Sequence, residues 1–190
     1  MGRIEQLQEQ MGRQRVRLLE AIEPLPDEAL LEPNAVGNWS VAGLLGILTA
    51  WDAEVVTGLM RLEQNKKPEK LLAALAQPTA YNQRAYEDNL TRDLDAIFDD
   101  FFRVRRQLEE WLEYFSNKDM ANPKRFPWFG RPLADVIAEA TWQQEKAYAD
   151  RLQAFAERWL AENREPVEGS QVIPLTAVFT DNELTTDETK

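Results

Sequence analysis

The chain has 190 residues and a net charge of −11, from 22 Lys and Arg against 33 Asp and Glu. This charge disfavours binding to nucleic acid, because a phosphate backbone would be repelled and the basic residues are spread among carboxylates. The chain contains no cysteine and no histidine, which excludes disulfides, thiolate chemistry and the commonest nitrogen ligands for zinc, nickel or iron. Any reaction must rely on carboxylates, tyrosine, lysine or bound water.

The length favours one domain, since a single core of this size buries roughly 70% of the surface of the unfolded chain. We expect it to span residues 1–163. No uninterrupted apolar run reaches the ~20 residues needed to cross a bilayer, and no secretory leader precedes the first charged helix. These patterns predict a soluble, cytoplasmic protein that does not bind membranes.

The first predicted helix spans residues 3–22. Its apolar residues recur at steps of three and four, the spacing of one buried helix face, and Arg15 falls in the same stripe. Pro24 and Pro26 end this helix. Residues 27–31 can form one further helical turn, and a loop containing Gly37 leads to the next long helix.

The second long helix, at residues 41–63, is the predicted centre of the fold. Ser40 is its expected N-cap, because a serine oxygen can accept hydrogen bonds from the first-turn N–H groups. A strip of small residues runs beside its apolar stripe: Gly43, Gly46, Ala50, Ala53 and Thr57. Two glycines lower helix propensity, so the strip predicts close approach by another helix, either within the chain or across a two-fold homodimer.

Short helices are predicted at residues 70–76 and from Pro78 through Tyr86. Long helices are predicted at residues 92–116 and 133–162, separated by a proline-rich, aromatic loop at residues 123–132. The fold class is therefore all-α: a four-helix bundle with short extra helices between the second and third long helices. Residues 164–190 form an acidic, extended C-terminal tail with one apolar run at residues 172–179, expected to dock on the bundle or on a partner.

Several segments together resemble the DinB-like superfamily of four-helix bundles. The run that begins WSVAGLLGILTAWD at Trp39 resembles its second helix, and Tyr81 with Asn82 resembles the start of its third segment. The FPWFGRPL loop at residues 126–133 and the following ATWQQEKAYADRL helix look most similar to the ClbS/DfsB-like branch. The matches span about residues 4–159.

This resemblance also implies a metal-free site. Metal-binding members carry three histidines, and the matching positions here are Ile47, Gln144 and Tyr148. An aliphatic side chain offers no ligand atom, and an amide and a phenol are poor ligands for a divalent metal. We therefore expect no cofactor. ClbS-like proteins are understood to hydrolyse a strained electrophile without a metal. The tyrosine that is typical of that branch would fall at position 47, where this chain has isoleucine, so the chain departs from the branch pattern at this position.

On the family geometry, Asp52 and Tyr148 are the predicted catalytic residues: a carboxylate to orient water and a phenol to donate a proton. The expected ligand pocket is lined by Trp51, Tyr81, Asn82, Trp142, Gln144 and Glu145. Two functions remain open. One is binding or hydrolysis of an electrophilic, genotoxic small molecule in a protective role. The other is a non-catalytic, homodimeric interaction protein, in which Gln144 and Tyr148 satisfy one another and Asp52 forms a salt bridge.

Overall fold

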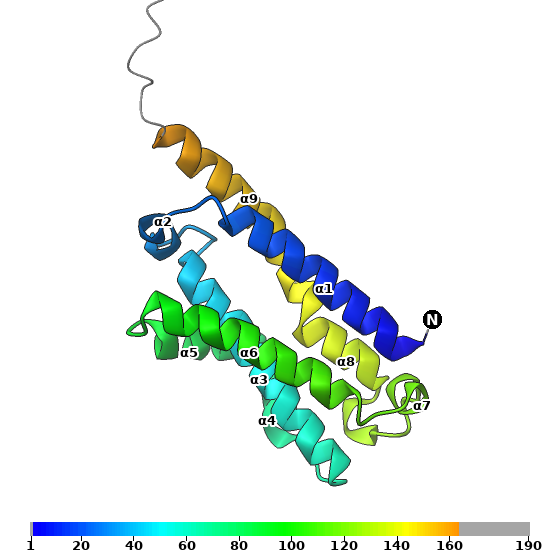
Figure 1. Cartoon of the computed structure of the whole chain (residues 1–190). Coiled ribbons are helices and arrows are strands. Elements are labelled where there is room, and N and C mark those ends of the chain that lie inside the picture. Colours follow the sequence, from blue (N-terminus) through cyan, green and yellow to red (C-terminus); the bar gives the residue numbers. More distant parts are fainter. Residues whose placement is uncertain (1, 164–190) are drawn as a thin grey trace, which may run out of the picture.

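The computed structural model describes residues 2–163, which form an all-α domain (Figure 1). The only β pairing within this range is one isolated bridge, between Val36 and Trp39. The helices are α1 (Arg3–Ile22), α2 (Asp27–Leu31), α3 (Val41–Glu63), α4 (Glu69–Ala76), α5 (Pro78–Asn89), α6 (Leu94–Leu112), α7 (Asn117–Ala121), the 3-10 turn η1 (Pro127–Phe129), α8 (Leu133–Ala140) and α9 (Trp142–Glu162). The predicted fold class is confirmed.

The long helices pack as two pairs. α1 lies along α9, and α3 lies along α6, while α8 bridges the pairs at one end (Figure 1). The short helices α4 and α5 pack on α3 on the side away from α1 (Figure 1). They lie between the second and third long helices in chain order, where short extra helices were predicted. The amphipathic faces of the helices therefore enclose the interior of the bundle, where the buried apolar residues form two hydrophobic clusters.

α3 is the core helix, as expected. The Ser40 Oγ accepts a hydrogen bond from the Gly43 N–H at 3.0 Å and so caps its first turn. Within residues 2–163, α3 alone has the length and hydropathy of a membrane span, and 72% of its most apolar window is buried inside the protein. This extent of burial is that of a core helix in a packed bundle.

The small-residue strip of α3 is occupied by α5. A Cβ atom added at Gly43 would lie 2.3 Å from the Tyr86 ring, and one added at Gly46 would lie 2.6 Å from Asn89. Glycine is therefore required at both positions for α5 to approach. The strip serves packing within the chain, which was one of the two alternatives, and it does not argue for a dimer.

Some helix boundaries differ from the predictions. α6 begins at Leu94, because Asp93 caps it by accepting from the Ala96 N–H at 2.8 Å, and it ends at Leu112. Residues 117–121, for which no helix was predicted, form α7 with a Ser116–Asp119 capping box.

The last long helix is interrupted at Thr141, where the sequence predicted continuity. The Thr141 hydroxyl donates to the Ile137 carbonyl at 2.7 Å, and its φ of −122° departs from helical values. A threonine bonded back to the preceding turn bends a helix. The predicted tail, residues 164–190, lies outside the described residues.

Candidate functional site

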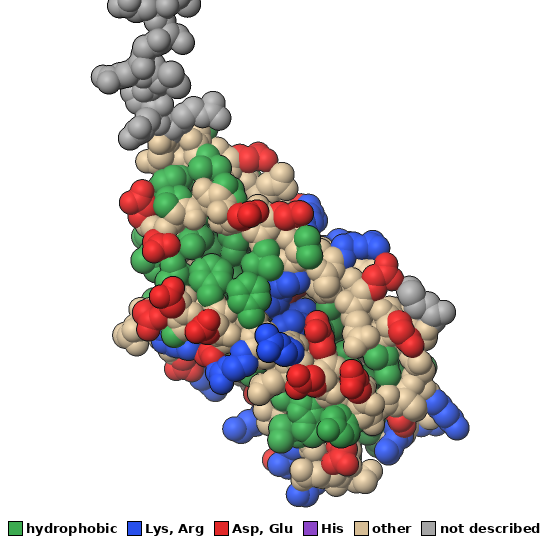
Figure 2. Space-filling model, viewed as in Figure 1, with side chains coloured by type: hydrophobic (Ala, Val, Ile, Leu, Met, Phe, Trp, Pro, Cys, Tyr) green, Lys and Arg blue, Asp and Glu red, His purple; other side chains and the backbone are tan. Residues whose placement is uncertain are grey.

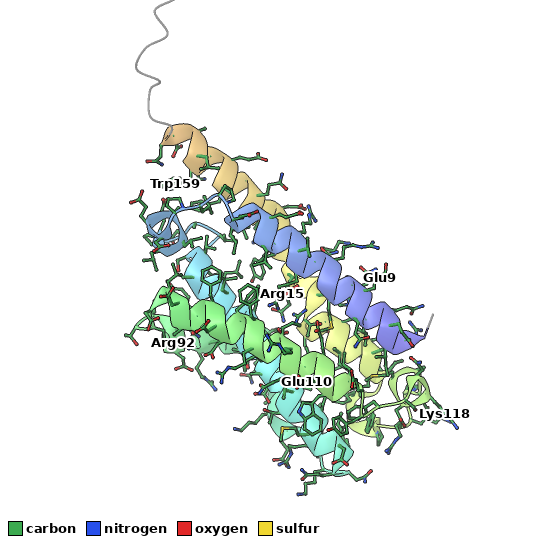
Figure 3. All side chains as sticks on the ribbon, in the orientation of Figure 1. Glu9, Arg15, Arg92, Glu110, Lys118 and Trp159 are labelled. Carbon is green, nitrogen blue, oxygen red and sulfur yellow. The ribbon has the colours of Figure 1, made fainter. Side chains whose placement is uncertain are left out.

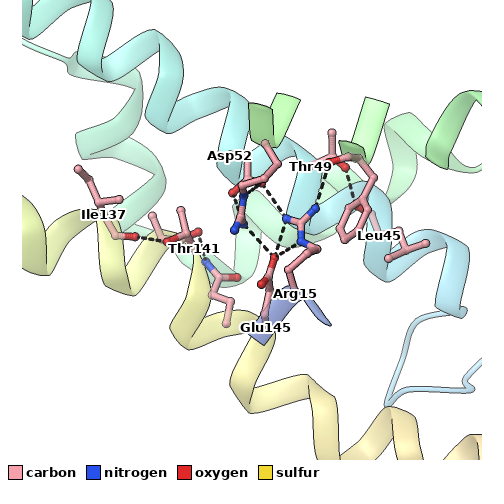
Figure 4. Close-up of polar contacts among 11 residues, drawn as sticks. Arg15, Leu45, Thr49, Asp52, Ile137, Thr141 and Glu145 are labelled. Carbon is pink, nitrogen blue, oxygen red and sulfur yellow. Dashed lines mark hydrogen bonds and ion pairs between the residues drawn. The ribbon is translucent and has the colours of Figure 1, made fainter. Parts of the chain in front are cut away.

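Four charged side chains meet at the centre of the bundle, one from each long helix. Arg15 comes from α1, Asp52 from α3, Arg105 from α6 and Glu145 from α9. Figure 4 shows Arg15, Asp52 and Glu145 turned toward one another. All four are buried, at 7%, 1%, 6% and 0% exposure. We call this group the ion cluster. Its formal charge is zero, since two guanidiniums face two carboxylates.

Hydrogen bonds join all four members of the ion cluster. Asp52 accepts from Arg105 Nε at 2.9 Å, from Arg105 Nη2 at 3.0 Å and from Arg15 Nη2 at 3.0 Å. Glu145 Oε1 accepts from Arg15 Nε at 2.8 Å and from Arg105 Nη2 at 2.9 Å. Arg15 also donates to the Phe101 carbonyl and lies 3.6 Å from the centroid of that ring. The cluster is therefore a cross-link between four helices.

The pKa values of the two arginines shift in opposite directions. Burial lowers the pKa of Arg15, and neighbouring Arg105 lowers it further. Burial also acts to lower the pKa of Arg105, but the charges of Asp52 and Glu145 outweigh it and raise that pKa. The ordinary pKa of arginine lies far above neutral pH, and each guanidinium here pairs with both carboxylates. Asp52 is thus held in ion pairs, away from solvent.

The sequence contained a signal for this cluster. Arg15 and Arg105 both fall within apolar, three-and-four-spaced stripes that predict buried helix faces. A buried arginine requires a carboxylate partner, and Asp52 and Glu145 supply them. The sequence analysis placed both carboxylates in the pocket, kept a salt bridge as the alternative for Asp52, and did not identify the two arginines as the partners.

The aromatic pocket residues next to Asp52 are engaged in packing. Trp51 donates its indole N–H to Asn82 Oδ1 at 2.7 Å, and its ring lies 4.6 Å from the ring of Tyr81. Tyr81 donates its hydroxyl to the Ala50 carbonyl at 2.8 Å. The expected association of Trp51, Tyr81 and Asn82 therefore exists, and it fastens α5 to α3.

Gln144 and Tyr148 lie elsewhere, in a shallow surface pocket of about 360 Å³. Glu139, Gln143, Ala147 and Arg151 complete its lining, and neither Asp52 nor Asn82 takes part. Gln144 donates to the Ala140 carbonyl at 3.3 Å. Trp142 lines a separate groove between α1 and α8. The structure thus distributes the predicted pocket residues over several surfaces.

A larger pocket of about 560 Å³ lies between α3, α4 and α5, and we call it the Glu54 pocket. Alanines form much of its wall, and charged groups stand around them. Its lining residues are Glu54, Lys70, Ala73, Ala74, Ala76, Gln77, Ala80, Tyr81, Arg84 and Asp88. Of the predicted site residues, it includes Tyr81.

One carboxylate that lines this pocket, that of Glu54, is half-buried. Its Oε1 atom is buried and has no hydrogen-bond partner within the described part of the chain. Burial raises the pKa of Glu54, and the nearby Lys70 partly offsets that rise. Burial and the Glu54 charge also raise the pKa of Tyr81, so its phenol stays protonated. The sequence analysis missed Glu54, which lies just two residues beyond Asp52.

The side chains at the family's metal positions do not fit a metal. Ile47 is fully buried in the hydrophobic core. Gln144 and Tyr148 line a different, outward-facing pocket. Across residues 2–163, no group of three or more His, Cys, Asp or Glu side chains is arranged to hold a metal ion.

Comparison with known proteins gave one match. Neither the curated proteins nor the solved structures contain a detectable relative. The sequence model of the DinB superfamily matches residues 10–146, which is more than half of the 190-residue chain and includes all four members of the ion cluster. The chain belongs to the DinB superfamily.

Proposed function

We propose that this protein binds a small molecule in the Glu54 pocket and acts without a metal, in a protective role against an electrophilic compound. The observation that carries the proposal is the buried Glu54 Oε1 atom, for which residues 2–163 provide no hydrogen-bond partner. Leaving a buried acceptor unpaired costs about 1–3 kcal/mol, so a ligand that donates a hydrogen bond there recovers this energy. The pocket volume, about 560 Å³, falls in the range of small-molecule sites.

The lining defines the ligand class. The carboxylate favours a donor such as an amine or amide N–H, and the alanine wall favours a flat apolar body. Lys70, Arg84 and Asp88 stand among the lining residues and suit polar substituents. The ligand we propose is thus a mostly apolar ring compound with one N–H donor.

The reaction that we propose for this pocket is hydrolysis, with Glu54 as the general base. In its ionised form Glu54 takes a proton from water, the water oxygen forms a bond to a strained carbon, and the ring bond to the leaving atom breaks. Glu54 then returns the proton to that atom. A raised pKa suits this role, because a general base works best when its pKa lies near the working pH. Resemblance to the ClbS/DfsB-like branch supports this reaction class.

A thermal-shift screen tests binding. The compounds are aryl amines, amides and small aryl epoxides, applied to the wild type, to Glu54→Gln and to the control Glu63→Gln, an exposed carboxylate on the same helix. A ligand at 100 times its Kd stabilises by about 2.7 kcal/mol. We expect the shift in the wild type and the control and its loss in Glu54→Gln. Shifts that are equal in all three proteins contradict the proposal.

Mass spectrometry of the same mixtures tests catalysis. A hydrolase produces the adduct of compound and water in the wild type and not in Glu54→Gln. If a compound binds but this hydrolysis product does not form, the protein is a ligand-binding protein and not a hydrolase. The catalytic roles of Asp52 and Tyr148 stay predictions, and Tyr148→Phe in the same screen tests the second of them.

A second candidate is a non-catalytic interaction protein, which the ion cluster favours. The cluster fills the centre of the bundle with side chains that pair with one another, although Arg105 Nη1 and Glu145 Oε2 have no hydrogen-bond partner within residues 2–163. If no compound shifts the wild type, this candidate replaces the first. We also propose a cytoplasmic location, with which a sequence without cysteine is compatible.

A further inference from the structure

An apolar groove of about 440 Å³ lies on the face shared by α1, α2 and α6. It is lined by Val16, Leu19, Glu20, Ile22, Glu23, Leu25, Leu30 and Phe98, and we call it the apolar groove. Large hydrophobic side chains beside it are exposed, with Val16 at 54%, Leu31 at 55% and Phe102 at 46%. Figure 2 shows this continuous hydrophobic surface on the same side of the molecule as the end of α9. Contiguous surfaces of this kind mark interaction sites.

We propose that the apolar groove is covered by residues 172–179 of the same chain. This run, VIPLTAVF, is the one long apolar stretch within residues 164–190, and carboxylates flank it on both sides. Six apolar residues in a run of eight match a groove whose lining is mostly aliphatic and aromatic. Burial of both surfaces provides the driving force, at about 25 cal/mol for each Å² of apolar area.

The end of α9 brings this segment to the groove. Trp159 lies beside α2 (Figure 3), and Trp159 and Leu160 pack against the hydrophobic cluster that contains Ile22, Leu25 and Leu30. Residues 164–171 then provide eight residues of tether, which span at most roughly 26–29 Å when extended. A tether this short gives a local concentration on the order of millimolar. The same chain therefore outcompetes a second copy at ordinary protein concentrations.

Charge sets the direction of the segment along the groove. Glu20 and Glu23 stand at the α1 end, whereas α6 continues past Phe102 to Arg103, which pairs with Asp100, and to Arg106. The carboxylates that follow the apolar run, Asp181 and Glu183, match Arg106 at this end. We therefore place residue 172 near α2 and residue 179 near Phe102. An anionic membrane is a poorer occupant, because Glu20 and Glu23 would face its headgroups.

Disulfide trapping tests the proposal directly, since the chain contains no cysteine of its own. The double variant Leu19→Cys with Leu175→Cys places one cysteine in the apolar groove and one in residues 172–179, so that a disulfide can form between them. The control, Tyr114→Cys with Leu175→Cys, uses a residue that is 70% exposed beyond the far end of α6. We expect the first pair to oxidise at least about ten times faster, as a species of monomer mass, because proximity raises the effective concentration.

Equal rates in the two double variants overturn the proposal. A disulfide-linked dimer as the main product also overturns it and assigns the groove to a second copy. Absence of any disulfide overturns it too.

Hydrogen exchange on the unmodified full chain provides an independent measurement. Residues 172–179 should exchange more slowly than residues 181–190 in the wild type, and Ile173→Asp should remove this protection. Ile173→Asp should also increase the binding of a hydrophobic dye, because the groove becomes accessible. Exchange at one rate across residues 172–190 of the wild type, or dye binding that Ile173→Asp leaves unchanged, contradicts the proposal.

Discussion

Replacing one member of the ion cluster changes the charge of the protein interior. Asp52 holds two guanidiniums, so its removal leaves both with fewer partners in a region that water does not reach. Several kcal/mol are needed to bury an unpaired charge, although a complete pair is close to neutral for stability. The cluster therefore specifies the arrangement of the helices more than it increases the stability of the fold.

We expect Asp52→Asn to lower the free energy of unfolding by roughly 3–5 kcal/mol, measured by urea denaturation. Adding Arg105→Met restores neutrality, so the double variant should lose less than the sum of the two single variants. Glu9→Gln is the control, because Glu9 pairs with Arg13 on an exposed face and should change stability by at most ~1 kcal/mol. Additive losses would show that the cluster is not coupled.

Glu54 should give stability a specific pH dependence. Its pKa is raised in the folded state, so the folded state favours the protonated form. The wild type should match Glu54→Gln below the unfolded pKa of about 4.3 and become the less stable of the two as pH rises through the folded pKa. Denaturation curves of both proteins across pH 4 to 8 measure this difference. A difference that grows as pH falls has the wrong sign for a desolvated carboxylate.

At the scale of elements, the periodicity of apolar residues predicted where the helices lie, and local capping chemistry decided where they end. The sequence predicted residues 3–22, 27–31 and 41–63 with the bounds that the structure shows. The break at Thr141 could not be predicted, because it depends on a hydroxyl bonding to its own helix. The candidate site was less predictable still, since the partners of a buried charge depend on how separate helices cross.

A matched pair of glycines tests the close approach of α5 to α3. Gly43→Ala should destabilise, because the new methyl group would overlap the Tyr86 ring, which Trp39 holds in place at 4.8 Å between centroids. Gly12→Ala in α1 meets no atom within 4 Å and should stabilise by roughly 0.5–1 kcal/mol through helix propensity. Thermal unfolding of both variants measures the two effects. Stabilisation by both would mean that α5 does not pack against Gly43.

At the scale of the whole molecule, the oligomeric state remains a prediction. The small-residue strip is occupied by α5, so the expectation of a homodimer depends on the habit of the superfamily. Light scattering over a concentration series should give about twice the 21.9 kDa mass of the chain. A mass of one chain at every concentration contradicts it.

The chemistry of the donor set predicts that the purified protein carries no stoichiometric transition metal. Elemental analysis after dialysis measures the content directly, and incubation with a chelator should leave the melting temperature unchanged. One zinc or nickel ion per chain that survives dialysis would show that ligands other than the aligned positions form a site.

The ion cluster also constrains the order in which the protein can fold. Its hydrogen bonds join residues up to 130 positions apart, so loop closure across most of the domain must precede its completion. A nascent chain that has exposed Arg15, Asp52 and Arg105 carries an excess positive charge at the future centre, and Glu145 is synthesised last. The first three long helices, α1, α3 and α6, therefore have no neutral interior of their own, and the domain should become stable as a unit only after α9 has left the ribosome.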